Sequence, residues 1–521
     1  MRAALVALLW MARASGLRSG PPIAWSIAGS DSGGGAGVEA DLRTFRALGV
    51  HGCAVVTSLT AQNSLGVAAA LETPPSHVAA TIAALESDLA PACVKVGMLS
   101  GAGAAREVAA FLERNAACRL VLDPVLASSS GRPLLDAAGV AVLVGDLLPR
   151  CAVATPNARE AEALLGLEPG GVRTAGDVEA AAAAFLDRFG CGSVLLKGGH
   201  VDLGDAADFW TDGARTAWLA GGRVAGLGAG GAHGTGCVLS SALAAALARG
   251  DDVADAVVVA KAFCGAAIAR AAAARVGAGP PPADAPPAWP GPRAATYGVP
   301  RAGLGRRLAP GPPRAFPPVA GLRLYALAPS AARCAALWDA GVRDVQLRVK
   351  GARRDAVAAE VEAAAAAAAA RPAARLWVND DWRLAARFGA FGAHLGQEDL
   401  AALGDGDLAE LRDSGLRLGV STHCLSELAV AAALAPSYVA LGPVFGTTSK
   451  HVPFSPRGLD LVSDWRALVP DDVPLVAIGG VTLERAAGVL EAGADGIAVI
   501  SALPEDGLAE AAASWTALWD R

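Results

Sequence analysis

The sequence is poor in the residues that mark several classes of protein. Aromatic residues make up 5% and charged residues 18% of the 521 residues, and only three tyrosines are present. The nine cysteines include no Cys-x-x-Cys pair, which disfavours zinc sites and disulfides and indicates thiols in a reducing compartment. The net charge of -6 gives no sign of a nucleic-acid surface. The composition is therefore that of an ordinary globular protein.

Long apolar runs are also absent. No uninterrupted run reaches the roughly 18 residues that a membrane-spanning helix needs, so we expect no membrane partner. The alanine run 363–370 lies between Glu362 and Arg371 and predicts a helix instead. Glycine and proline are plentiful, at 62 and 32 residues, and they mark the boundaries and the sites.

The start of the chain lacks acidic residues. Residues 1–20 contain three arginines, and the first carboxylate is Asp31. An acid-free, arginine-bearing leader is typical of an organelle transit peptide. This favours a plastid, with the cytoplasm as the alternative. A secretory signal, a frayed extension and a misplaced start stay open.

A proline-dense segment divides the chain. Residues 277–318 have almost no apolar periodicity, so they cannot bury enough surface to offset the entropy of ordering. We expect an extended linker there, between domains at 21–276 and 319–521. Each is long enough to form its own core.

Short apolar runs alternate with helical stretches in the first domain. The runs are 23–29, 53–59, 94–98, 120–125, 152–155 and 194–196. This alternation predicts an α/β fold, a largely parallel sheet with helices on both faces. A glycine-rich turn, SDSGGGAG, follows the first run, but no Gly-Lys-Ser/Thr follows it, so it is not a Walker A motif.

A second glycine-rich stretch, GGAHGTGC, spans residues 230–237 and precedes a long Ala/Leu helix. Glycines at a helix start let several backbone N–H groups converge, and the helix dipole adds positive charge. The stretch therefore suits an anion, with a plain helix cap as the alternative.

The first domain resembles the hydroxymethylpyrimidine/phosphomethylpyrimidine kinases of the ribokinase-like superfamily, an α/β/α sandwich. The motifs are AGSDSGGGAGVEADLRTF, TAQNSLGV, KVGML, LDPV, TPNARE, LKGGH and HGTGC, in that order. The resemblance implies a pyrimidine pocket, an anion hole, a group of residues for Mg²⁺ and ATP, and a lysine for the nucleotide phosphates. The pyrimidine pocket would comprise Gly29, Asp41, Gln62 and Met98, and the anion hole Gly234, Thr235 and Gly236. The residues for Mg²⁺ and ATP would be Asp123, Asn157 and Glu160, and the lysine for the nucleotide phosphates would be Lys197.

The resemblance also implies a catalytic base. Cys237 stands where many ribokinase-like sugar kinases have aspartate. We expect the helix N-terminus to lower the pKa of its thiol; a small buried core cysteine is the alternative. His233 either holds the loop or touches ATP.

Eight short apolar runs recur in the second domain, most followed by a helical stretch. They are 322–327, 345–349, 376–378, 393–395, 416–420, 438–441, 475–478 and 497–500. Eight such units predict a closed (β/α)₈ TIM barrel, with its chemistry at the carboxyl ends of the strands. In Gln346-Leu347-Arg348-Val349-Lys350 the three polar side chains fall on one side of a strand.

This domain resembles thiamine phosphate synthase, through VQLRVKG, WVNDD, GAHLGQED, LGVSTH, ALGPVFGTTSK, VAIGG and GADGIAVISA. Gly446 stands where proline is expected. Glu398 is a supporting carboxylate or a ligand, and His394 and His423 are read as structural. The resemblance implies three groups: a pyrimidine pyrophosphate site, a thiazole phosphate site and a Mg²⁺ pair. The pyrimidine pyrophosphate site would comprise Gln346, Arg348, Lys350, Asn379, Ser421 and Lys450. The thiazole phosphate site would comprise Thr447, Ser449, Gly480, Ile500 and Ser501, and the Mg²⁺ pair would be Asp380 with Asp399.

The two resemblances imply a bifunctional enzyme of thiamine biosynthesis. Its partners would be small molecules: hydroxymethylpyrimidine and its phosphates, thiazole phosphate, and ATP as co-substrate with Mg²⁺. Two alternatives stay open, a pyridoxal-type kinase fused to a phosphate-binding barrel and a non-catalytic sensor of the pathway. The sequence leaves the oligomeric state open, a homo-oligomer included.

Overall fold

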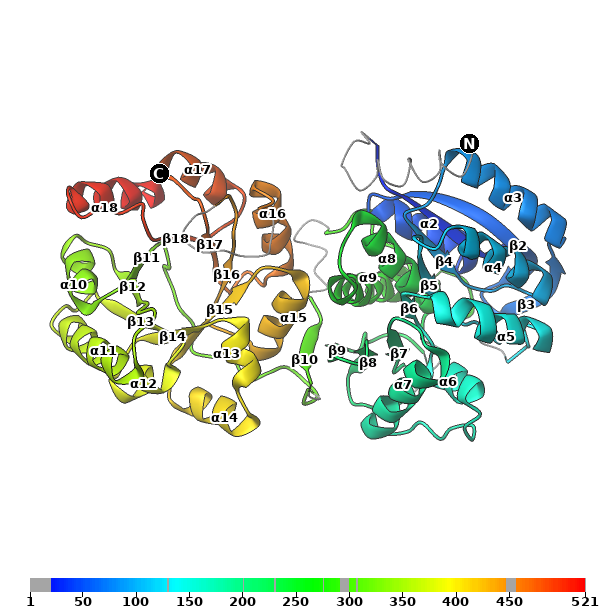
Figure 1. The fold of residues 1–521 in the computed structure, drawn as a ribbon, viewed down its shortest axis with the longest axis horizontal. Coiled ribbons are helices and arrows are strands. Elements are labelled where there is room, and N and C mark those ends of the chain that lie inside the picture. Colours follow the sequence, from blue (N-terminus) through cyan, green and yellow to red (C-terminus); the bar gives the residue numbers. More distant parts are fainter. Residues whose placement is uncertain are drawn as a thin grey trace. The chain divides into compact units, whose positions relative to one another are not determined.

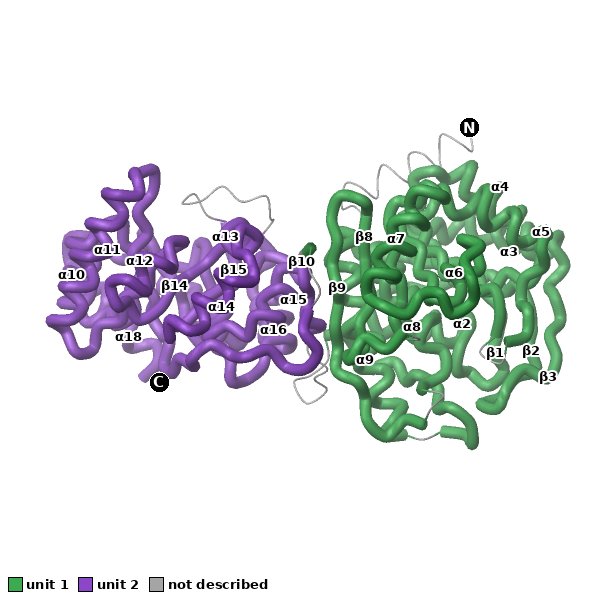
Figure 2. Tube along the Cα trace, turned by 90° about the horizontal axis from the view of Figure 1, so that it is seen from below, with its two compact units in different colours: residues 1–291, 305–307 green, residues 292–304, 308–521 purple. Residues whose placement is uncertain are grey.

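The computed structural model describes residues 20–128, 131–199, 201–228, 231–274, 276–290, 299–305, 308–446 and 456–520. The predicted leader, residues 1–20, lies outside them except for Gly20. The chain divides into two compact units, residues 1–291 with 305–307 and residues 292–304 with 308–521 (Figure 2).

One sheet organises the first unit (Figure 1). Its strands follow the order β9-β8-β7-β6-β5-β4-β1-β2-β3, and β1, β2, β4, β5, β6 and β7 are parallel to their neighbours in that set. This confirms the six predicted strands. The bounds are β1 Ile23–Asp31, β2 His51–Asn63, β3 Gly66–Glu72, β4 Cys93–Val96, β5 Arg119–Leu122, β6 Val153–Ala154, β7 Val194–Lys197, β8 Ala206–Thr211 and β9 Thr216–Gly221.

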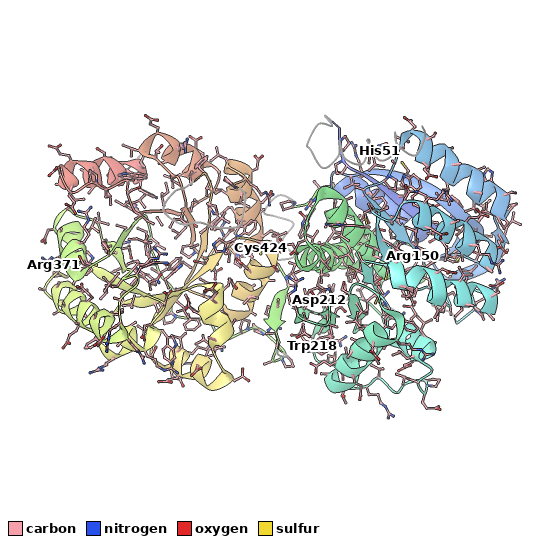
Figure 3. The ribbon with its side chains drawn as sticks, viewed as in Figure 1. His51, Arg150, Asp212, Trp218, Arg371 and Cys424 are labelled. Carbon is pink, nitrogen blue, oxygen red and sulfur yellow. The ribbon has the colours of Figure 1, made fainter. Side chains whose placement is uncertain are left out.

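Three antiparallel strands were not predicted: β3, β8 and β9. Strand β3 is largely exposed and alanine-rich, so it lacks the alternation that marks a half-buried strand. Strands β8 and β9 meet at a turn in which the Asp212 carboxylate accepts from Ala214 N (3.0 Å) and Arg215 N (2.7 Å). Asp212 and Trp218 are labelled in Figure 3. The Asp-Gly pair at this turn is a hairpin signal that sequence reasoning passed over.

Helices cover the sheet in two groups. Helices α2, α8 and α9 pack together, α3, α4 and α5 pack as successive neighbours, and α6 packs against α7. This completes the predicted α/β sandwich, a sheet between two groups of helices. The bounds are α2 Gly37–Ala47, α3 Pro75–Asp88, α4 Ala102–Arg114, α5 Ala137–Val142, α6 Ala158–Leu165, α7 Ala175–Phe189, α8 Thr235–Arg249 and α9 Val253–Ala274.

Helix α9 corrects one expectation. It is long and apolar enough to cross a membrane by length and composition, with a mean hydropathy of 1.7, because alanine and valine continue past its single lysine. Within the unit, however, 61% of that apolar window is buried, and α9 packs against α8. These properties are those of a core helix.

The proline-dense segment is anchored at both ends, so the predicted linker bounds are too wide. At its start, Pro281 O accepts from His233 N (2.9 Å), and Trp289 N donates to Ala47 O (3.0 Å), both within the first unit. At its end, Phe316 N donates to Ala435 O (3.0 Å) within the second unit. A short strand, β10 (Arg301–Leu304), lies between. Ala283, in the same stretch, is buried as well.

The second unit is a closed barrel of parallel strands in sequence order, β11 to β18. All eight predicted runs are confirmed as strands. They are β11 Leu324–Ala328, β12 Asp344–Leu347, β13 Arg375–Asn379, β14 Gly392–Leu395, β15 Arg417–Thr422, β16 Tyr438–Leu441, β17 Leu475–Ile478 and β18 Gly496–Val499. The helices are α10 Ala331–Asp339, α11 Arg354–Ala369, α12 Trp382–Arg387, α13 Gln397–Ala402, α14 Asp405–Asp413, α15 Leu425–Leu434, α16 Leu459–Leu468, α17 Leu483–Glu491 and α18 Leu508–Thr516.

Glycine makes room for aromatic rings inside the barrel. Gly419 pairs with Tyr438 in the register of β15 and β16, and a Cβ on Gly419 would lie 2.2 Å from the Tyr438 ring. Gly392 faces Trp377 in the same way, at 2.4 Å. Tyr325, Trp377 and Tyr438 therefore pack as one buried aromatic cluster.

Candidate active sites

The glycine-rich turn after β1 is held by Asp31. This buried carboxylate accepts backbone hydrogen bonds from Gly33 (2.9 Å), Gly35 (3.0 Å) and Ala36 (2.9 Å). Burial alone would raise its pKa, but His233 and the backbone amides outweigh burial, so the pKa of Asp31 lies below its ordinary value. An ionised Asp31 keeps the turn closed.

His233 connects this turn to the predicted pyrimidine residues. Its Nε2 lies 3.2 Å from Asp31 Oδ2 and 3.0 Å from the Gln62 side-chain amide. Of the two roles considered for His233, the geometry supports holding the loop. Gly29 lies against Met98, because a Cβ on Gly29 would come within 2.7 Å of Met98 Cε.

Asp41 does not occupy the position expected for it. Its side chain is fully buried and accepts from Ser26 Oγ (2.6 Å), Ser241 Oγ (2.7 Å) and Lys95 Nζ (2.7 Å). A carboxylate with no exposed surface does not line an open pyrimidine pocket. Asp41 instead holds Lys95, and removing either partner would leave a buried charge unpaired.

Cys237 lies in the electrostatic field of this buried pair. Burial raises the pKa of the Cys237 thiol to about 11; the charge of Lys95 opposes the rise, and Asp41 and Asp123 add to it. The expectation that the helix N-terminus lowers this pKa is therefore wrong.

The start of α8 is shaped to present backbone N–H groups. Gly234 precedes the helix at φ +76°, and a Cβ there would lie 1.9 Å from Gly35 O, so the position requires glycine. A Cβ on Gly236 would lie 3.3 Å from Lys197 Nζ and 3.4 Å from Asp123 Oδ2. The predicted anion hole therefore adjoins the predicted charged residues.

Lys197 joins the two acidic residues predicted for Mg²⁺ and ATP. Its Nζ lies 2.7 Å from Asp123 Oδ1 and 3.9 Å from Glu160 Oε2. Burial raises the pKa of Glu160 to about 7, Lys197 opposes the rise, and Asp123 adds to it. Asn157 and Glu160 also form the capping box of α6, which fixes both side chains at the edge of the sheet.

In the barrel, Asp380 and Asp399 come together as predicted. Asp380 follows β13 at φ +67°, and Asp399 lies in the first turn of α13, where its Oδ2 accepts from Gly396 N at 2.8 Å. Burial, the charge of Asp399 and a hydrogen bond with Asp399 raise the pKa of Asp380 to about 6, while Arg348 and Lys350 oppose the rise. Two carboxylates that repel each other in this way fit a divalent cation.

The polar residues at the end of β12 and just after it become more exposed along the chain. Gln346 is 3% exposed and donates to the Tyr325 hydroxyl (3.1 Å). Arg348 is half-buried and Lys350 is exposed, and both act on the Asp380 carboxylate. Asn379 closes β13 beside them. Gln346 therefore lies below the charged group rather than within it.

The predicted thiazole phosphate site is described only in part. Gly480 adopts φ +61°, and a Cβ there would lie 2.4 Å from Gly446 O; Ile500 is 40% exposed, and Ser501 is also exposed. Ser421, at the end of β15, lies 2.8 Å from His394 Nε2. Thr447, Ser449 and Lys450 fall outside the described residues.

Two general expectations can be checked against the described residues. None of the nine cysteines, all of which are described, forms a disulfide. In the described part of the chain, no group of three or more His, Cys, Asp or Glu side chains is placed to hold a metal.

Comparison with known proteins identifies both units. The family model for phosphomethylpyrimidine kinase matches residues 31–283, and that for thiamine monophosphate synthase matches residues 324–503. A probable thiamine biosynthetic bifunctional enzyme, chloroplastic, from Oryza sativa subsp. japonica is 32% identical over 94% of this chain and 88% of its own length. The chain belongs to the family of bifunctional thiamine biosynthetic enzymes.

Single-unit relatives agree with this assignment. The thiamine-phosphate synthase of Klebsiella pneumoniae is 46% identical over 40% of this chain and 93% of its own length. The hydroxymethylpyrimidine/phosphomethylpyrimidine kinase of Rhizobium meliloti (strain 1021) is 43% identical over 48% of this chain and 91% of its own length. The first unit is thus the kinase and the second the synthase.

Sequence reasoning missed several residues that shape these sites. In the kinase unit they are Asp31 and Lys95, whose motifs were noted without a role for either side chain. In the synthase unit they are Tyr325 and Tyr438, two of only three tyrosines. A lysine between two valines in a buried strand, and a rare tyrosine in an apolar run, are the signals that pointed to them.

Proposed function

We propose that the kinase unit transfers the γ-phosphoryl group of ATP to hydroxymethylpyrimidine and to its phosphate. The synthase unit then couples the pyrimidine pyrophosphate with thiazole phosphate, giving thiamine phosphate and pyrophosphate. One observation carries the proposal: each unit gathers its own charged residues beside the carboxyl ends of its strands, Lys197 with Asp123 and Glu160 in one and Arg348 with Asp380 and Asp399 in the other.

In the kinase, Cys237 accepts the proton of the substrate hydroxyl as its oxygen attacks phosphorus. The N–H groups of Gly234, Thr235 and Gly236 stabilise the charge on the transferring group. Lys197 neutralises the nucleotide phosphates, and Gln62 and Met98 face the pyrimidine. The observation that Gly236 adjoins Lys197 supports this division of roles.

In the synthase, the bond between the pyrimidine methylene carbon and the pyrophosphate oxygen breaks, and the thiazole nitrogen takes that carbon. Arg348, Lys350 and Asn379 hold the departing pyrophosphate, with Gln346 and Lys450 beside them by resemblance. Ser421 contacts the pyrimidine. Thr447, Ser449, Gly480, Ile500 and Ser501 receive the thiazole phosphate, since barrels commonly bind phosphate after strands seven and eight.

Mg²⁺ fits both sites on the chemistry of the residues present. Asp380 with Asp399 would hold it in the synthase, and Asp123, Asn157 and Glu160 would hold it in the kinase. The raised pKa values of Asp380 and Glu160 support this assignment, because burial and a neighbouring carboxylate disfavour the ionised form of each group. When bound, the ion would neutralise phosphate charge.

Product analysis of the whole chain tests the proposal. The protein is supplied with ATP, Mg²⁺, hydroxymethylpyrimidine and thiazole phosphate, and thiamine phosphate is measured by chromatography. Omitting ATP should abolish the product, and adding the pyrimidine pyrophosphate should restore it. Phosphorylation of pyridoxal but not of the pyrimidine would contradict the proposal.

We also propose that residues 1–20 direct the protein to a plastid. The chloroplastic rice relative supports this, as does the acid-free leader. A fluorescent reporter carrying residues 1–30 should accumulate in plastids. A diffuse cytosolic signal would contradict this address.

A further inference from the structure

The first part of the proline-dense segment packs against the kinase site. Pro281 O accepts from His233 N (2.9 Å), and Ala283 N donates to His233 O (2.8 Å), so both backbone polar groups of His233 are bonded to this stretch. Ala283 is 1% exposed. We call residues 277–283 the strap. The strap thus holds the residue that immediately precedes the predicted anion hole.

The strap also contacts the turn between β2 and β3. Gly279 N donates to Ser64 Oγ (3.2 Å), and a Cβ on Gly279 would lie 1.9 Å from Ser64 O. Gly277 has φ +82°, and a Cβ there would lie 2.5 Å from Ser64 Oγ. Both glycines are therefore needed for the backbone of the strap to reach Ser64, which stands two residues after Gln62.

A third contact reaches the glycine-rich turn after β1. A Cβ on Gly35 would lie 3.1 Å from Pro282 Cβ and 2.7 Å from His233 Cδ2, so the proline ring and the imidazole cover this glycine together. Gly35 O in turn lies 1.9 Å from the position of a Cβ on Gly234. The strap, the glycine-rich turn and the start of α8 therefore lie against one another in succession.

Proline suits a segment that crosses a site in this way. A proline ring fixes φ and carries no N–H group, so an extended run of prolines needs few hydrogen-bond partners and loses little entropy on ordering. The prolines of the strap still contribute a carbonyl acceptor at Pro281 and a ring contact at Pro282. A stretch whose composition is typical of a linker can therefore form a rigid part of a site.

The contacts of the strap converge on Gln62. They hold His233, whose Nε2 lies 3.0 Å from the Gln62 side-chain nitrogen, and Ser64, which follows Gln62 in the chain. The charged residues of the nucleotide side, Lys197 and Asp123, pair with each other instead. The strap therefore acts on the pyrimidine side of the kinase.

We propose that the strap is part of the kinase active site and fixes Gln62 and His233 for recognition of the pyrimidine. Gly279 and Pro282 are then positioning residues that act through these two side chains. This rests on the proposed function, which brings the pyrimidine to Gln62. It adds that the kinase site is completed by a stretch that composition assigns to the connection between the two enzymes. The pyrimidine and the closed strap should therefore stabilise each other.

Steady-state kinetics of the full chain test the proposal. Gly279→Ala places a methyl group against Ser64 O and should raise the KM for hydroxymethylpyrimidine about tenfold, the worth of one hydrogen bond. Ser64→Ala removes only the hydroxyl acceptor and should raise this KM about threefold. The double variant should match Gly279→Ala within about twofold, because both changes loosen the same contact. In all three variants the KM for ATP should stay within about twofold of wild type.

Asp284→Asn is the matched control. Asp284 directly follows the strap, and its carboxylate pairs with Arg270 Nη2 on α9 at 2.7 Å, with both side chains nearly half exposed. An exposed pair contributes little to stability, so this variant should leave the KM for hydroxymethylpyrimidine within about twofold. If Asp284→Asn raises this KM as much as Gly279→Ala does, or if Gly279→Ala raises the KM for ATP equally, the strap is only structural and the proposal fails.

Hydrogen exchange gives a readout that a merely structural role would not move. Mass spectrometry of peptides from the full chain follows the amides of residues 277–290. At about ten times the dissociation constant of hydroxymethylpyrimidine, exchange through opening of the strap should slow about tenfold, because the ligand binds the closed form. ADP with Mg²⁺ should leave this exchange within about twofold, since it favours neither form. Exchange that the pyrimidine does not slow would overturn the proposal.

Two further measurements keep the outcomes distinct. Circular dichroism reports folding, and Pro282→Ala, which should raise the same KM about threefold, replaces Gly279→Ala if the latter does not fold. If wild type neither binds nor phosphorylates hydroxymethylpyrimidine, the proposed function has failed. If wild type is active but its KM is insensitive to the strap variants, only the strap has failed.

Discussion

At the scale of single residues, the two active sites differ in how they treat buried charge. The kinase pairs its buried carboxylates with lysines, Asp41 with Lys95 and Asp123 with Lys197, each at 2.7 Å. The synthase leaves Asp380 and Asp399 facing each other. A carboxylate paired with a lysine is already neutralised and holds its neighbours in place, whereas two adjacent carboxylates form a site that a cation can neutralise.

Cys237→Ser should reduce phosphoryl transfer roughly 10²–10⁴-fold, the usual worth of a general base. Because burial raises the pKa of Cys237 to about 11, little thiolate exists at neutral pH. If Cys237 is the base, wild-type turnover should rise as pH increases from 7 toward 10. Stopped assays across this range measure the slope. Cys264→Ser, a buried thiol beside Thr235, should keep the wild-type slope, and a persistent slope in Cys237→Ser would contradict the assignment.

Asp380→Asn should make the protein accumulate the pyrimidine pyrophosphate. The substitution removes one charge from the Asp380–Asp399 pair, so Mg²⁺ should bind the synthase more weakly while the kinase continues to work. Coupling should fall at least about tenfold at limiting Mg²⁺ and recover partly as Mg²⁺ is raised. Product analysis at several Mg²⁺ concentrations measures this.

Glu160→Gln is the converse variant. It should slow formation of the pyrophosphate ester and leave coupling of supplied ester unchanged. Since burial raises the pKa of Glu160 to about 7, the carboxylate is ionised above neutrality and protonated below it. Wild-type kinase turnover should therefore fall more steeply as pH drops from 8 to 6 than loss of the Cys237 thiolate alone requires, and this additional fall should be absent from Glu160→Gln. Loss of coupling in Glu160→Gln would show that the two sites are not independent.

At the scale of elements, loops that follow strands depend on glycine where two backbones approach closely. Gly480, after β17, holds φ +61° and lies under Gly446 O; Gly234, before α8, lies under Gly35 O. In both places the backbone itself borders the proposed phosphate site. A side chain would displace the neighbouring loop.

Gly480→Ala should raise the KM for thiazole phosphate about tenfold, because a left-handed residue with a side chain costs roughly 1–2 kcal/mol before the clash is counted. Kinase turnover should not change. Gly406→Ala, in α14 with open space around it, is the control and should leave both activities intact. Steady-state kinetics with supplied pyrimidine pyrophosphate decide the matter, and an unchanged KM in Gly480→Ala would remove this loop from the phosphate site.

At the scale of the whole molecule, the chain holds two units that each close their own core. The contacts that anchor Pro281 and Trp289 lie within the kinase unit, and those of Phe316 lie within the synthase unit. Each unit therefore carries part of the proline-dense segment as structure. The segment that only connects is shorter than its composition suggests.

Separate fragments 20–290 and 314–521 should each fold and keep their own activity. A kinase fragment ending at residue 276 should melt at a lower temperature, since it loses buried Ala283 and the hydrogen bonds of Pro281 and Trp289. Each kcal/mol lost should lower the melting temperature by about 2–4 °C. Calorimetry compares the two kinase fragments. Equal melting temperatures would show that residues 277–290 add nothing, and insolubility of both units would mean that they fold only together.

The sequence by itself determined the two units, the six parallel kinase strands, the eight barrel strands and the family, because apolar periodicity and glycine-rich motifs are local. The resemblance also assigned Lys197 and Asp123 to one nucleotide site, and Asp380 and Asp399 were expected to meet because they follow adjacent barrel strands. Only the tertiary structure decided the rest. Asp41 became a buried partner of Lys95, the thiol of Cys237 acquired a raised pKa, and Pro281 and Ala283 came to hold His233. These outcomes depend on burial and on partners distant in sequence, and desolvation is a property of the packed molecule rather than of any motif.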